Sequence, residues 1–86
     1  MPTFEYFRPL LPGMLDRLWQ HAQTNPEAAQ LHVSGSILSM LMDAAAGDPF
    51  RAPLSKGAFD RTMTSFNNAY CDLMDRLGER PFDDAI

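Results

Sequence analysis

The sequence predicts an all-α protein, a small three-helix bundle of two long antiparallel helices and one shorter N-terminal helix. Apolar residues recur at helical spacing in three separate stretches, and prolines and glycines fall between them. The chain has 86 residues, enough for one domain, and 45% of them are hydrophobic, as in a folded globule. We therefore expect a single helical domain over residues 1–86.

The N-terminal region combines an apolar arm with the shortest helix. Residues 1–11 carry three aromatic side chains without a clear period, and Pro2 and Pro9 disfavour a long helix there. Pro12 suits a first helical position, where its missing N–H costs nothing. A helix over about 13–24 is then indicated by one apolar stripe, formed by Leu11, Met14, Leu15, Leu18, Trp19 and Ala22.

A long helix is expected over about 26–46. Asn25 can cap it, Pro26 fits its first position, and Glu27 complements the positive end of the helix dipole. Gly47, followed by Asp-Pro, is well placed to end it. The glycine in residues 34–36 (Ser-Gly-Ser) costs about 1 kcal/mol of helix propensity. The sequence leaves open a continuous helix, a kink or break there, and a short strand at 31–33.

The third helix, over about 56–77, has the most regular pattern in the chain. Ser55 is its expected cap, and Gly78 and Pro81 follow its end. Residues 78–86 form a short acidic tail. A heptad-like seam runs along the helix without gaps, and its members are Phe59, Met63, Phe66, Tyr70, Leu73 and Leu77.

The long helix at 26–46 carries more apolar surface than one neighbouring helix can cover. One of its faces consists of Leu31, Leu38, Leu41 and Ala45, and the adjoining face of Val33, Ile37, Met40 and Ala44. A helix that is apolar over most of its circumference is normally buried inside a larger core. Because 86 residues supply little material to surround it, we expect another chain to cover part of this helix or of the helix at 56–77.

Few residues suggest chemistry. His21 and His32 lie on different expected helices without metal-ligand spacing, and Cys71 has an acid, Asp72, rather than a base as its neighbour. No phosphate loop, catalytic triad or zinc spacing is present in the sequence. We therefore expect no catalytic, cofactor-binding or metal-binding residues, and a protein that is not an enzyme.

The charge distribution disfavours several partners. The formal net charge is −4, and residues 72–86, with five acids and two arginines, account for −3 of it. A negative surface repels nucleic acid and anionic membranes but can attract a basic protein. No apolar run is long enough to span a bilayer, and the N-terminus does not resemble a signal peptide, so we expect a cytoplasmic location. Six arginines against one lysine fit the GC-rich codons of a bacterium or its phage.

These observations favour a small protein–protein interaction module. It would regulate or inhibit a larger protein or complex through apolar helix faces, as a homodimer or with a partner that has a basic surface. Alternatives are a helical DNA-binding transcriptional regulator and a small ligand-binding bundle or enzyme, with a pocket near His32, Tyr70 and Cys71. The candidate partner-binding residues are Trp19, Met40, Met42, Asp72, Asp75 and Glu79.

Overall fold

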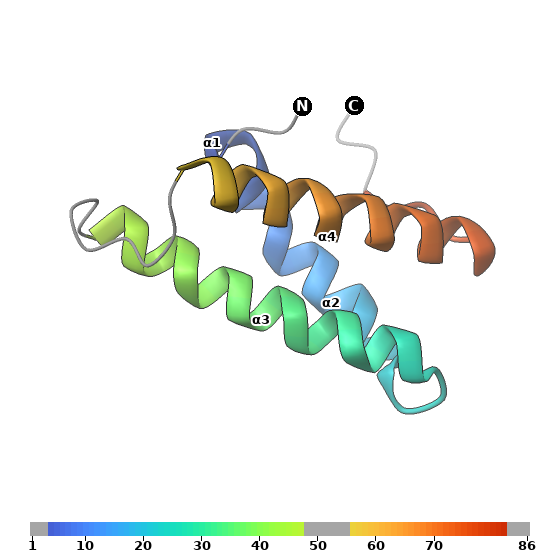
Figure 1. Cartoon of the computed structure of the whole chain (residues 1–86). Helices are drawn as coiled ribbons and strands as arrows, with labels where there is room; N and C mark the ends of the chain where they lie inside the picture. Colours follow the sequence, from blue (N-terminus) through green and yellow to red (C-terminus); the bar gives the residue numbers. More distant parts are fainter. Residues whose placement is uncertain (1–3, 48–55, 83–86) are drawn as a thin grey trace.

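The computed structural model describes residues 4–47 and 56–82, and the part of the chain that it describes is helical, without strands (Figure 1). The prediction of an all-α fold is therefore confirmed. The elements in chain order are α1 (Phe4–Phe7), a 3₁₀ turn η1 (Arg8–Leu10), α2 (Leu11–Ala22), α3 (Pro26–Gly47) and α4 (Lys56–Arg76). Ser55, the loop at 48–55 and the end of the tail at 83–86 lie outside the described residues.

The N-terminal segment, expected as an apolar arm without a long helix, forms two short helical turns. α1 and η1 lead directly into α2, which begins at Leu11 and ends at Ala22, two residues earlier at each end than expected. Pro9 and Pro12 both occupy first-turn positions, which do not require a backbone N–H, so two prolines are compatible with consecutive helical turns. The turns place Phe7 fully in the core, with its ring edge-on to Phe66.

α3 begins at the expected cap and is continuous through residues 34–36. The side-chain oxygen of Asn25 accepts hydrogen bonds from the N–H groups of Glu27 and Ala28, at 3.0 and 3.2 Å. Ser36 donates its hydroxyl to the carbonyl of His32 one turn earlier, which keeps this serine inside the helix. Gly35 is buried, and a Cβ there would lie 2.7 Å from Leu15 and 2.8 Å from Phe66. The glycine is therefore explained by the close approach of α2 and α4 at this point.

α4 ends in a glycine cap, and the chain then folds back. Gly78 has φ +73°, and the N–H of Glu79 donates to the carbonyl of Met74 at 2.9 Å, as in a Schellman motif. Residues 78–82 then return along the molecule, so that the Tyr70 hydroxyl donates to the Pro81 carbonyl and Phe82 lies against the Tyr70 ring. The described part of the expected acidic tail is therefore packed against the core.

The core lies between the three main helices. α2 and α3 are joined by a short turn and run side by side, while the start of α3 and the end of α4 meet through a Glu27–Arg76 ion pair (Figure 1). α3 and α4 therefore run in opposite directions. The buried side chains are Phe7, Leu11, Met14, Leu18, Ala28, Leu38, Met42, Phe59, Met63, Phe66, Tyr70, Leu73 and Met74.

Candidate functional site

The outward side of α3 is the main exposed apolar surface that the structure describes. Val33, Ile37 and Met40 follow each other at helical spacing and remain 58%, 54% and 70% exposed. α3 lies along one edge of the molecule, with α2 and α4 on its other side (Figure 1). We call these three side chains the α3 outer face. Exposed side chains of this size in one row are typical of a surface that another protein covers.

The α3 outer face is free of charge along its whole length. Residues 28–42 contain no Asp, Glu, Lys or Arg. The acids at either end are engaged within the chain, since Arg76 donates to Glu27 at 2.6 Å and Arg8 donates to Asp43 at 3.2 Å. The hydrogen bond from Arg76 lowers the pKa of Glu27, and the same bond raises the pKa of Arg76. A partner of this surface is thus presented with apolar side chains rather than with unpaired acids.

Trp19 lies beside this surface. It is 63% exposed on α2, and its ring centre is 5.2 Å from that of His32, the residue before Val33. Tryptophan combines a large apolar area with one N–H donor and is enriched at interface hot spots. Its position widens the apolar surface from α3 onto α2.

The two methionines among the predicted partner-binding residues have opposite environments. Met40 belongs to the α3 outer face, whereas Met42 is only 1% exposed and packs in the core. The interpretation of Met42 as a surface residue is therefore corrected. Its position on the helix brings it back to the side of Leu38 and Gly35, which faces α2 and α4.

The three predicted acidic residues lie in the last turns of α4 or just after it, and two of them have partners in the chain. Asp72 accepts from Arg76 at 3.2 Å, and Glu79 contacts the imidazole of His21. Asp75 is exposed. These contacts reduce the negative charge available to a basic partner, and they place the acids on α4 and the segment after it rather than on α3.

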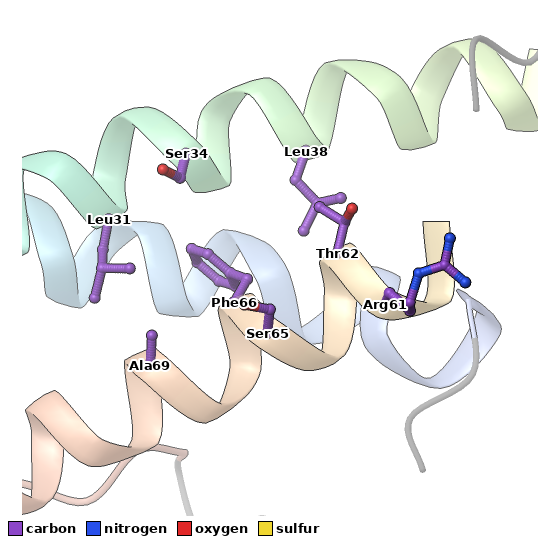
Figure 2. A pocket seen from close by; sticks show the side chains of 8 residues that line it. All are labelled: Leu31, Ser34, Leu38, Arg61, Thr62, Ser65, Phe66 and Ala69. Atoms are coloured by element: carbon purple, nitrogen blue, oxygen red, sulfur yellow. The ribbon is translucent and has the colours of Figure 1, made fainter. Parts of the chain in front are cut away.

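A second feature is a groove between α3 and α4, with a volume of about 390 Å³ (Figure 2). Leu31, Leu38 and Phe66 form its apolar floor, and Arg61 lies at one end. The remaining lining residues are Ser34, Thr62, Ser65 and Ala69. The groove is an open depression beside the α3 outer face and shares that helix with it.

The residues considered for chemistry have separate neighbours. The His32 ring lies at a tilt against Trp19, and Tyr70 is buried between Phe66 and Phe82. Cys71 is half-buried, and burial raises the pKa of its thiol, which favours the unreactive protonated form. His32, Tyr70 and Cys71 are absent from the lining of the α3–α4 groove.

The described residues form neither a metal-binding cluster nor a membrane-spanning helix. Within 4–47 and 56–82, no three His, Cys, Asp or Glu side chains are grouped so that they could hold a metal ion. The helices in these same ranges are too short or too polar to cross a membrane.

Comparison of the chain with protein-family models, curated proteins and solved structures finds no match.

The sequence analysis did not name Val33 and Ile37 among the candidate partner-binding residues. Their spacing with Met40, four and then three residues, was a visible signal, because it places all three on one side of a helix. The sequence indicated two adjoining apolar faces of this helix. It did not show which face would meet α2 and α4, because the orientation of the helix depends on the close packing of Leu15 and Phe66 against Gly35.

Proposed function

We propose that this protein is a small interaction module that binds another protein through the α3 outer face and Trp19. The observation that supports this function best is the row of Val33, Ile37 and Met40, each more than half exposed on a helix that has no charge between residues 28 and 42. Burial of such side chains is a favourable term in association. A partner helix or apolar groove would be the complementary surface.

A role as a regulator or inhibitor of a larger protein follows from this mode of action. The chain is small, and its apolar surface is displayed on a rigid, continuous helix, so that binding needs little ordering of the backbone. The exposed Asp75 and the net charge of −4 would add long-range attraction to a partner with a basic surface. We place this function in the cytoplasm, where the thiol of Cys71 would stay reduced.

DNA binding has less support from the same surface. Proteins that bind DNA neutralise phosphates with lysine and arginine, and residues 28–42 have neither. A ligand-binding pocket at His32, Tyr70 and Cys71 has less support too, because these residues have separate neighbours.

The proposal predicts that two charges on the α3 outer face abolish partner binding. Ile37→Glu combined with Met40→Glu would require burial of two carboxylates without partners. The tagged variant and the tagged wild type are used for affinity capture from the native host, followed by mass spectrometry. We expect at least one protein to be retained by the wild type and lost at least tenfold with the variant.

A matched control carries the same added charge elsewhere. Gln20→Glu combined with Asn68→Glu changes two exposed positions, one on α2 and one on α4, and should retain the same protein. Equal retention by both double variants, with native circular dichroism for each, would show that the α3 outer face is not the binding surface.

A further inference from the structure

We infer that the α3 outer face binds a second copy of this chain, so that two α3 helices pack antiparallel about a two-fold axis between Ser36 and Ile37. This inference rests on the proposed function and names the partner for its surface. It follows from three features of α3: the order of its outward residues, the absence of charge along them, and the position of Trp19.

The outward residues of α3 are arranged symmetrically by size. Val33 and Met40 are equally distant from the point between Ser36 and Ile37, and the small residues Ala29 and Ala44 are equally distant beyond them. Reversing the helix therefore sets Val33 against Met40 and Ala29 against Ala44, while Ile37 lies level with Ser36 and next to the second Ile37 at the axis. A two-fold interface requires this self-complementarity, because residue i contacts j while j contacts i.

The charges of α3 are compatible with such a pair. An antiparallel arrangement centred at this point places Asp43 level with Gln30 of the second copy, so that no two acids are opposed. Asp43 and Glu27 are already paired with Arg8 and Arg76 of their own chain. Covering an uncharged surface with another uncharged helix face leaves no buried charge without a partner.

Trp19 completes the arrangement. Its ring lies at a tilt of 49° against that of His32, the residue before Val33 on α3. In the antiparallel pair the level of Val33 receives Met40 of the second copy. A flexible methionine side chain would thus fit between a valine and a tryptophan, the kind of contact that sulfur makes favourably with aromatic rings. The same contact occurs twice by symmetry.

Pairwise disulfide trapping tests the geometry directly. In a Cys71→Ser background, a cysteine is introduced either at Val33 (Val33→Cys) or at Met40 (Met40→Cys). In the antiparallel pair each of these positions faces the other, while like positions are about 10.5 Å apart along the axis, too far for a disulfide. We expect an equimolar mixture of the two variants to form the mixed disulfide at least tenfold faster than either variant forms its own dimer.

A cysteine outside the proposed interface provides the control for disulfide trapping. Gln20→Cys in the same background lies outside the proposed interface and should form dimers no faster than random collision allows. If Val33→Cys alone or Met40→Cys alone formed disulfide-linked dimers as fast as the mixture forms the mixed disulfide, the antiparallel pair would be overturned. Sedimentation of the wild type at 9.7 kDa throughout the micromolar range would overturn self-association altogether. If affinity capture still depended on Ile37 and Met40 in that case, the proposed function would stand with a different partner.

Discussion

At the scale of single residues, Gly35 allows the three helices to approach each other. A Cβ at this position would lie 2.7 Å from Leu15 and 2.8 Å from Phe66, so these two buried or half-buried side chains would have to shift. Gly35→Ala gains about 1 kcal/mol of helix propensity, but overpacking of a core typically costs about 1–3 kcal/mol. We expect a net loss of about 1 kcal/mol in the free energy of unfolding, measured by urea denaturation.

Gly13 provides the matched control for this substitution. It also lies within a helix, α2, but nothing comes within 4 Å of a Cβ built there. Gly13→Ala should therefore stabilise the protein by about 0.5–1 kcal/mol. The two alanine substitutions should have opposite signs. Equal stabilisation by both would mean that α2 and α4 do not pack as closely on Gly35 as the structure indicates.

At the scale of elements, the pair of Glu27 and Arg76 joins the first turn of α3 to the last turn of α4. Arg76 lowers the pKa of Glu27 in the folded state below its ordinary value of 4.5. A lowered folded pKa stabilises the protein above the unfolded pKa, and this stabilisation is lost as the pH falls through the folded value.

Glu27→Gln should therefore remove a pH-dependent part of the stability. We expect the free energy of unfolding of the wild type to exceed that of the variant most at pH values above the unfolded pKa of Glu27, and this difference to shrink as the pH falls below that pKa. This difference in the free energy of unfolding is measured by urea denaturation, followed by circular dichroism, at several pH values. Asp16→Asn, which removes another exposed acid, serves as the control. A difference that stays constant from pH 7 to pH 3 would exclude the ion pair as its cause.

The sequence was most informative where an element depends on local signals. Asn25 caps α3 as expected, and the seam of α4 from Phe59 to Leu73 is buried. The N-terminal segment forms short helical turns over residues 4–10 that its irregular apolar pattern did not predict, and Pro9 is compatible with them because it occupies a first-turn position. Continuity of α3 at Gly35 and the burial of Met42 depend on contacts between helices, which single-sequence patterns do not encode.

At the scale of the whole molecule, α3 divides the apolar residues of the chain into a core and an exposed surface. Ile37 and Leu38 are neighbours in sequence and similar in size, yet Ile37 is exposed and Leu38 is buried. Leu38→Ala should destabilise the monomer by about 2–5 kcal/mol because it leaves a cavity. Ile37→Ala should change the stability of the monomer by less than about 0.5 kcal/mol.

The concentration dependence of thermal unfolding separates these two roles. A folded chain that associates with a second copy gains stability by mass action, so the Tm of the wild type should rise with protein concentration. Leu38→Ala should lower the Tm at every concentration and preserve that rise, since the outer face is intact. Ile37→Ala should leave the Tm at low concentration unchanged and abolish the rise.

Calorimetry over a hundredfold range of concentration, roughly 5–500 µM, would detect the difference, because occupancy of a micromolar dimer changes most across that range. A concentration-independent Tm for the wild type would assign the α3 outer face to a partner other than a second copy.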